Sequence, residues 1–294
     1  MDGLPPFEYH RPSTIEEAVA LLARFGEDAK PMAGGTDLLV QMKNRWASPR
    51  HLIALKWIPG LDGVTDGERV RIGALATHSR IKGSPLIRSR FPILIDALSR
   101  LGSQQIRNFA TIGGNLCNAA PSADSAPALL ALGAKVGLAG PRGKREMGLE
   151  GFFLAPGRTA LNPDEILESI LLPSPPPFSC GAYIKHMRRA ALDLPIVGVA
   201  TQCTFTPDLK KMEDVRIGLG VCAPTPIRAK AAEAFLRGKP VEEEILNQGG
   251  TIASQEAKPR DTWRGSASYR SDMIRELIRE AISLSRDRTR GLQS

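Results

Sequence analysis

The sequence predicts an α+β fold, and three observations carry this prediction. The first part of the chain mixes short β-rich runs with segments whose apolar residues recur at helical spacing. A stiff, proline-rich stretch at 173–177 (PSPPP) then marks a domain boundary near residue 176. Beyond it, three strand-like runs joined by tight turns precede three amphipathic helices, which is typical of a domain with a three-stranded antiparallel sheet and helices.

The first predicted element is a helix over 15–25, where apolar residues recur at helical spacing until a glycine ends the run. Ser13 as N-cap and Glu16 three residues later have the form of a capping box at its start. Two short strands are expected next, at 30–33 and 51–55, and the first of them leads into a glycine-rich loop.

Strands and helices continue to alternate up to the linker. We predict a hairpin over 62–74, a helix over 91–101, strands over 134–138 and 145–149, a short helix over 151–153 and a strand over 167–172. After the linker, the predicted strands are 180–186, 195–206 and 215–221, and the predicted helices are 229–236, 241–253 and 272–285.

Two loops contain a double glycine, and both precede a helical pattern. The first reads Ala33-Gly34-Gly35-Thr36-Asp37, and the second reads Thr111-Ile112-Gly113-Gly114-Asn115. Adjacent glycines allow backbone N–H groups to face a bound anion, and the flanking hydroxyl and amide groups suit a phosphate or a sugar. Neither loop is a Walker A or a GxGxxG motif, and glycine in a turn is commonly only conformational. Two such loops together favour a pyrophosphate.

A polar segment follows the second loop and opens an apolar run from 126 to 132, which reads as a helix entering the core. Ser122 and Asp124 lie in this segment. Asp124 is placed either to cap that helix or to accept a hydrogen bond from a sugar hydroxyl, and the sequence leaves both roles open.

Composition argues against several classes of function. The net charge of +8 comes from scattered basic residues without interleaved aromatic residues, so we expect no nucleic-acid binding. The four cysteines form no CxxC pair, so we expect no local metal site. No run approaches the roughly 20 apolar residues of a membrane span, and we expect a cytoplasmic protein. No acid pair, nucleophile motif or other catalytic constellation is evident, so no catalytic residue is predicted.

Three stretches carry a resemblance to a known family. AGGTDLL at 33–39, the stretch QIRNFATIGGNLCNAAPSADSAPALLAL at 105–132, and the later APTPIRAKAAEAFL resemble the FAD-binding (medium) subunit of molybdenum hydroxylases. That family includes the medium subunit of aerobic carbon monoxide dehydrogenase and the FAD subunit of bacterial xanthine dehydrogenases. The resemblance covers nearly the whole chain, from about Phe7 to Leu284.

The resemblance implies an N-terminal FAD-binding region, 1–176, of two α/β subdomains (about 1–55 and 56–176) with a vanillyl-alcohol-oxidase/PCMH-like fold, and a C-terminal domain over 177–294. FAD is then expected between the two, with both double-glycine loops holding its pyrophosphate. Leu167 lies where relatives meet the flavin ring edge through backbone atoms. Lys185 lies in a segment that leans over the isoalloxazine in relatives; the alternative is an outward-facing charge on a surface strand. Leu194 stands where relatives often carry an aromatic residue, which leaves the ring-stacking partner open.

The resemblance also implies a role and partners. Electrons would pass from a molybdenum–pterin site in a large subunit, through [2Fe–2S] clusters in a small subunit, to FAD in this chain and on to NAD or a quinone. The complex would be a heterotrimer or a dimer of heterotrimers, that is, a heterohexamer. Two alternatives remain: a stand-alone FAD-dependent oxidoreductase of the same superfamily, and a basic nucleotide- or nucleic-acid-binding protein without redox function.

Overall fold

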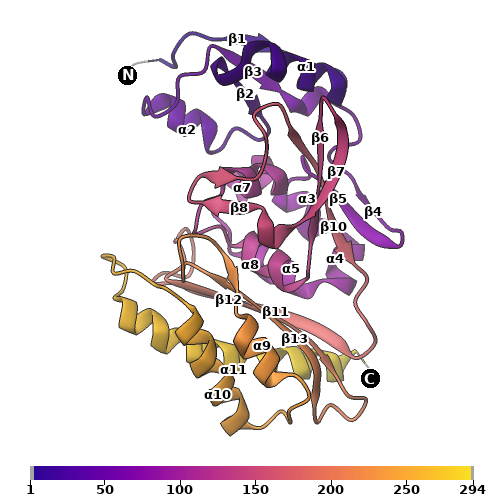
Figure 1. Cartoon of the computed structure of the whole chain (residues 1–294), viewed down its shortest axis with the longest axis vertical. Helices are drawn as coiled ribbons and strands as arrows, with labels where there is room; N and C mark the ends of the chain where they lie inside the picture. Colours follow the sequence, from indigo (N-terminus) through magenta and orange to yellow (C-terminus); the bar gives the residue numbers. More distant parts are fainter. Residues whose placement is uncertain (1–2, 293–294) are drawn as a thin grey trace.

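The computed structural model describes residues 3–292, and three sheets follow one another along its longest axis (Figure 1). The upper sheet is parallel, with strand order β1-β3-β2. Its elements are β1 (Glu8–His10), α1 (Ile15–Phe25), η1 (Gly26–Asp28), β2 (Ala29–Met32), α2 (Leu38–Lys43), β3 (His51–Ala54) and η2 (Leu55–Trp57).

The helix predicted over 15–25 is present as α1, but its cap lies one residue later than expected. Thr14, rather than Ser13, is the N-cap, and its Oγ1 accepts from the Glu17 backbone N–H at 3.1 Å. The Glu17 carboxylate, rather than that of Glu16, accepts from the Ser13 N–H at 2.6 Å. The helix buries Ala18, Val19 and Leu22.

The middle sheet is antiparallel, in the order β4-β5-β10-β6-β7. Its strands are β4 (Val64–Thr65), β5 (Arg69–Gly73), β6 (Lys135–Gly140), β7 (Gly143–Gly148) and β10 (Ile166–Pro173). The helices between β5 and β6 are α3 (His78–Gly83), α4 (Pro85–Arg90), α5 (Pro92–Ser99), α6 (Gln104–Phe109), α7 (Ile112–Asn118) and α8 (Ser125–Ala131). The short helix predicted over 151–153 lies two residues earlier, as the 3-10 turn η3 (Leu149–Gly151). Phe153, predicted to be helical, instead begins a two-stranded sheet of β8 (Phe153–Ala155) and β9 (Arg158–Thr159).

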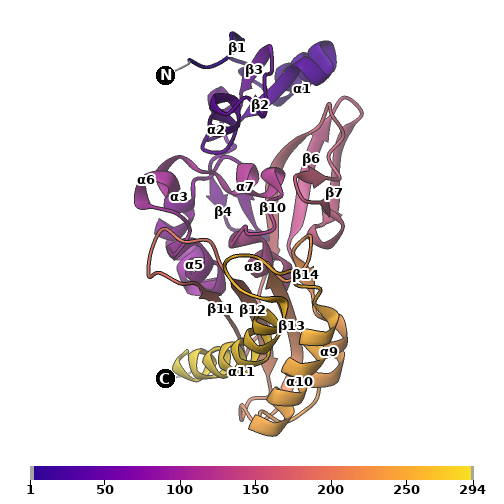
Figure 2. The ribbon, with the colours of Figure 1, turned by 90° about the vertical axis from the view of Figure 1, so that its left-hand side faces the viewer.

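The lower sheet contains the three predicted antiparallel strands and one more. Its order is β11-β12-β13-β14, and the fourth strand is only two residues long. The elements are β11 (Ser179–His186), β12 (Val197–Phe205), β13 (Met212–Gly220), β14 (Ile227–Arg228), α9 (Lys230–Leu236), α10 (Glu243–Glu256) and α11 (Ala267–Gly291). Helices α5 and α8 of the middle part pack on this sheet, and α11 packs on β11 and β12 from the other side (Figures 1 and 2).

Helix α11 is longer than the predicted 272–285 because Ser266 caps it early and charged residues extend it past the core. It buries Ile274, Leu277, Ile278 and Ala281, the apolar face expected from the sequence. Within residues 3–292, no helix is both long and apolar enough to cross a membrane.

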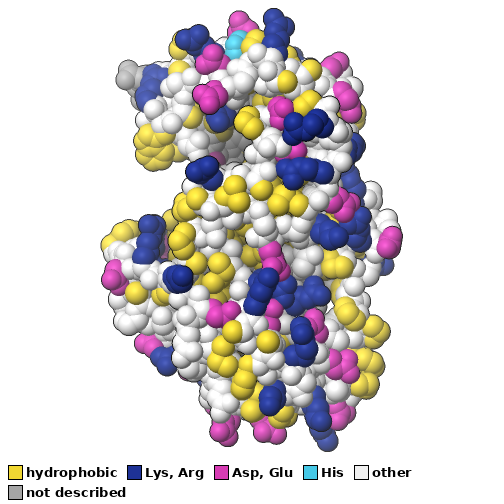
Figure 3. Space-filling view, in the orientation of Figure 1, with side chains coloured by type: hydrophobic (Ala, Val, Ile, Leu, Met, Phe, Trp, Pro, Cys, Tyr) yellow, Lys and Arg dark blue, Asp and Glu magenta, His cyan; other side chains and the backbone are white. Residues whose placement is uncertain are grey.

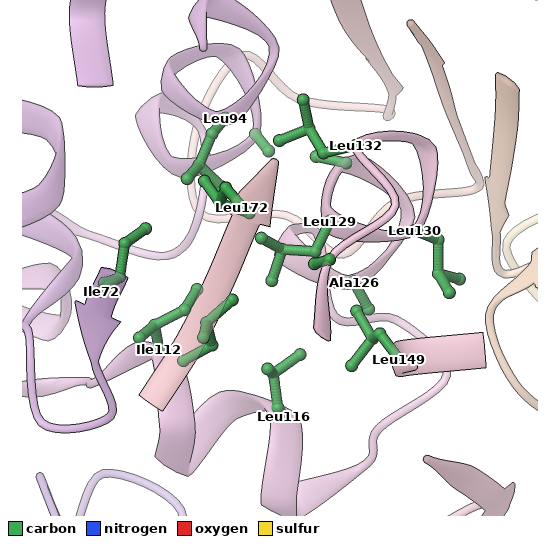
Figure 4. Packing of buried hydrophobic residues seen from close by; sticks show 14 of the residues in the cluster. Ile72, Leu94, Ile112, Leu116, Ala126, Leu129, Leu130, Leu132, Leu149 and Leu172 are labelled. Atoms are coloured by element: carbon green, nitrogen blue, oxygen red, sulfur yellow. The ribbon is translucent and has the colours of Figure 1, made fainter. Parts of the chain in front are cut away.

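The middle core contains the residues that hold the second double-glycine loop. Ile112 and Leu116 of α7 are fully buried, and they belong to the same core cluster as Leu172 of β10 and Leu129 of α8 (Figure 4). The loop is therefore fixed by the hydrophobic core directly beneath it.

We predict that Leu129→Ala lowers the free energy of unfolding by about 2–5 kcal/mol, because it empties a fully buried position. Leu154→Ala is the matched control: Leu154 is 61% exposed, and its truncation should change stability by less than about 0.5 kcal/mol. Urea unfolding followed by circular dichroism measures both. Equal effects for the two variants would contradict the core described here.

Candidate functional site

The two double-glycine loops meet where the upper sheet joins the middle one. The first loop leaves β2 and enters α2, and the second begins α7, with Thr111 as its N-cap. A Cβ atom on Gly34 would fall on the carbonyl oxygen of Phe109. The backbones of residues 34 and 109 are therefore in direct contact, and only glycine permits this approach.

A cleft of about 280 Å³ lies between these loops. Eight residues predicted to bind a cofactor line it: Ala33, Gly34, Gly35, Thr36, Asp37, Thr111, Gly114 and Asn115. Burial raises the pKa of the Asp37 carboxyl above its usual range. Ile112 and Gly113, also predicted, are buried under the loop, where a Cβ on Gly113 would meet Ala74.

The first loop has the chemistry of an anion site. Within residues 3–292, the backbone N–H groups of Gly34, Gly35 and Thr36 donate to no other group. Gly35 has φ 73°, in the left-handed region. Successive free N–H groups around such a residue form a concave arrangement that binds phosphate.

The second loop differs, because the protein already satisfies its backbone donors. The Ile112 and Gly113 N–H groups donate to the carbonyls of Ala76 (3.0 Å) and Ala74 (2.9 Å). The Gly114 N–H donates to Thr111 Oγ1 at 3.1 Å, and the Asn115 N–H donates to the Thr111 carbonyl at 2.9 Å. The second loop therefore offers its polar side chains and a glycine-walled surface to the cleft.

Several other residues line this cleft that the sequence analysis missed, namely Lys30, Pro31, Leu38, Gln41, Ala110, Cys117 and Asn118. Gln41 Nε2 donates to Asn118 Oδ1 at 3.3 Å, which links α2 to α7 across the cleft. Burial raises the pKa of the Cys117 thiol to about 12, so this cysteine stays protonated. The sequence did contain a signal for Cys117 and Asn118. A helix with Thr111 as its N-cap places residues 114, 115, 117 and 118 on one side of the helix.

Asp124 and Lys185 form a buried ion pair between the middle and lower parts. Lys185 Nζ donates to Asp124 Oδ2 at 2.9 Å and to the Arg100 carbonyl at 2.9 Å, and its side chain is 2% exposed. The Tyr183 hydroxyl donates to Asp124 Oδ1 at 2.8 Å. Burial raises the pKa of the Asp124 carboxyl, and Lys185 opposes this shift. Lys185 is therefore not an outward-facing charge, and its role as a flavin contact stays a prediction.

A second cleft of about 420 Å³ opens between the middle and lower parts. Its lining includes Ser122, another predicted residue, and Leu194, together with Lys258, Arg260 and Arg264. The chain passes from the first cleft at Asn118 to the second at Pro121 within three residues. Leu167, the last predicted residue, is buried in β10 and is not among the residues that line these two clefts, so its contact with the flavin stays a prediction.

A third hollow of about 620 Å³ lies on the other side of the first loop and shares Ala33, Gly34, Gly35 and Thr111 with the first cleft. Trp57, Ile58, Leu75 and Phe109 give it a largely apolar wall. Figure 3 shows lysine and arginine side chains spread over one whole face of the molecule and mixed with acidic ones. This face has no concentrated basic patch of the kind that nucleic acid requires.

Comparison with known families matches almost the whole chain. Residues 5–175 match the family described as FAD binding domain in molybdopterin dehydrogenase, and residues 182–284 match the CO dehydrogenase flavoprotein C-terminal domain. The interval between the two matches contains the last two residues of the proline-rich stretch and the start of β11.

Individual proteins are similar over the same extent. The chain is 36% identical over 278 residues to a putative xanthine dehydrogenase FAD-binding subunit of Escherichia coli (strain K12), covering 94% of each chain. It is 34% identical to the carbon monoxide dehydrogenase medium chain of Hydrogenophaga pseudoflava, covering 95% of this chain and 96% of that one. A crystal structure of the Cu,Mo-CO dehydrogenase in its cyanide-inactivated form superposes with a TM-score of 0.93 at 35% identity, covering 97% of this chain and 100% of the other.

We predict that Gly114→Val abolishes flavin binding and leaves the fold intact. The added side chain would start 2.9 Å from Thr111 Oγ1 and 3.6 Å from the Ala33 Cβ, and would fill the wall of the first cleft. Gly83→Val adds the same group where no atom lies within 4 Å and should retain flavin. The test is the flavin content per chain after desalting, measured by absorbance. Circular dichroism checks that each variant is folded. Normal flavin content in folded Gly114→Val protein would refute this site.

A second prediction concerns the buried ion pair. Lys185→Met should destabilise the chain by about 3–5 kcal/mol, because it leaves the Asp124 carboxylate buried without its cation. The double variant Lys185→Met/Asp124→Asn also removes the unpaired buried carboxylate, so it should recover part of the lost stability. Thermal unfolding of the two variants and the parent tests this, and a double variant no more stable than Lys185→Met would argue against a structural pair.

Proposed function

We propose the detailed function below from one premise. This chain belongs to the family of FAD-binding subunits of molybdopterin dehydrogenases, also called molybdenum hydroxylases. As a member, it is an oxidoreductase subunit that binds FAD and transfers electrons within a complex of several subunits. This membership argues against the stand-alone oxidoreductase and against the non-redox nucleotide-binding protein. FAD supplies the redox chemistry when bound, and the chain's own residues bind, orient and shield it.

We propose that the FAD pyrophosphate lies in the cleft between the two loops. The observation that carries this assignment is the row of free backbone N–H groups in the first loop, opposite the side chains of Thr111 and Asn115. The two loops therefore have different tasks. The first donates hydrogen bonds to the anion, and the second forms a rigid wall without a Cβ at Gly114.

We propose that the flavin ring lies towards the second cleft. Ser122 lines this cleft, and Asp124 and Lys185 follow it in a buried network that fixes the junction between the middle and lower parts. The Asp124–Lys185 pair acts there as a positioning element, since both of its charged groups are occupied by each other and by neighbouring polar groups. The apolar hollow beside Trp57 is suited to the adenine at the other end.

We propose that the partners are a molybdopterin-binding large subunit and a [2Fe–2S] small subunit, in a heterotrimer or a dimer of heterotrimers. The support is that relatives are described as medium chains of carbon monoxide dehydrogenase. A division of the chain near residue 176 and a cytoplasmic location also remain proposals. The first is supported by two core clusters, one mostly of residues 70–172 and the other of residues 196–282.

Of the two acceptors considered, we propose NAD rather than a quinone. Lys258, Arg260 and Arg264 line the second cleft, and their positive charges suit the phosphates of a dinucleotide. A quinone carries no such negative charge and prefers an apolar opening.

The function is tested on the complex purified from its own cytosol through a tag on this chain. We predict flavin absorption, two co-purifying subunits, and substrate-dependent reduction of NAD in preference to a quinone. Flavin that is reduced by an organic substrate in the isolated chain would support the stand-alone enzyme instead. Faster reduction of a quinone would overturn the acceptor and leave the electron-transfer role standing.

A further inference from the structure

Three side chains able to bind a metal ion converge on the upper sheet, outside the clefts described above. Glu8 and His10 belong to β1, and His51 is the first residue of β3. The two strands are parallel neighbours, with Glu8 opposite His51 in the register. A histidine side chain is visible at the top of the molecule in Figure 3, over the upper sheet. Sequence separation concealed the cluster, because residues 10 and 51 lie far apart along the chain.

The ligand atoms have the spacing of a single metal site. His10 Nε2 lies 3.1 Å from His51 Nδ1, the Glu8 carboxylate lies 3.3 Å from His51 Nδ1, and it lies 3.7 Å from His10 Nε2. A tetrahedral ion with bonds of about 2.0–2.2 Å to nitrogen and oxygen places its ligands about 3.3–3.6 Å apart. The three measured separations bracket this range.

The two imidazoles are also held in place before any ion binds. The His51 ring stacks on Phe25 of α1, with centroids 3.7 Å apart and planes 15° from parallel. The His10 ring is tilted against both of them, and the two histidine side chains are only 16% and 20% exposed. The Glu8 side chain is 71% exposed and free to adjust to an ion. Preorganised ligands reduce the entropic cost of binding.

We propose that Glu8, His10 and His51 form a binding site for Zn²⁺, with one coordination position open to water. Two imidazole nitrogens and one carboxylate are a donor set that proteins use for zinc. The site would act as a clamp. It would fasten β1, a three-residue strand at the edge of the sheet, to β3, so that zinc stabilises the upper part independently of FAD.

The experiment is calorimetric titration of the full flavin-loaded chain with Zn²⁺, after chelator treatment. One ion per chain is expected. His10→Gln and His51→Gln should each weaken zinc affinity by at least about tenfold, since even the loss of a residue hydrogen-bonded to a metal ligand lowers metal affinity about 10–100-fold. Zn²⁺ should raise the melting temperature of the parent and not of these variants, because the ion binds only the folded cluster. Co²⁺ as a probe should give the visible absorption of a four-coordinate ion.

His186→Gln is the matched control, since it removes a histidine outside the cluster whose ring contacts Tyr269. Its zinc affinity should equal that of the parent. Glu8→Gln, at an exposed position, keeps the test valid if a histidine variant fails to fold, and it too should bind zinc more weakly. An absence of saturable binding in the parent, or equal affinities for the parent and all three cluster variants, would overturn the proposal. The cluster would then be a hydrogen-bonded His–His–Glu network.

Discussion

Direct backbone contact at glycine joins the three parts of this molecule. At the upper junction, Gly34 lies against the carbonyl of Phe109, so the first double-glycine loop touches the segment that leads into the second. At the lower junction, a Cβ on Gly218 of β13 would fall on the carbonyl oxygen of Pro127 in α8. Each junction therefore depends on a different glycine, whose lack of a side chain allows the two backbones to touch. The clefts lie at these junctions, so the same constraint that holds the fold together sets the shape of the clefts proposed to hold the cofactor.

Polar contacts then fix the lower junction in one arrangement. The Asp124–Lys185 pair connects the start of α8 to β11, and Asp96 of α5 accepts from Arg288 of α11 at 2.6 Å and from the Tyr183 N–H at 3.1 Å. Burial makes the first pair costly to break. On the proposed placement, a flavin between the middle and lower parts meets surfaces whose relative position is already determined by the protein.

The sequence predicted the α+β class, most strands and helices, and the grouping of both loops around one cleft. Apolar spacing and turn residues are local signals, and they were sufficient for elements such as α1 and β11 to β13. Tertiary features were not accessible in this way. The two-residue strand β14, the pairing of Lys185 with Asp124, and the meeting of His10 with His51 all depend on contacts between segments distant in the chain. The cap at Thr14 instead of Ser13 shows the limit of local rules, since the two neighbouring hydroxyl residues are both acceptable caps by sequence.

The satisfied backbone of α7 bears on how the subunit matures. The first N–H groups of this helix are bonded to Ala74, Ala76 and Thr111, and its buried face is locked into the middle core. These N–H groups need no phosphate as a hydrogen-bond acceptor, so we expect this half of the site to form when the polypeptide folds. The loop after β2 has open N–H groups, and on the proposed placement of the pyrophosphate these groups gain hydrogen bonds when the cofactor binds. If the pyrophosphate binds there, we expect folding of the chain and loading of its flavin to be separable steps in biogenesis.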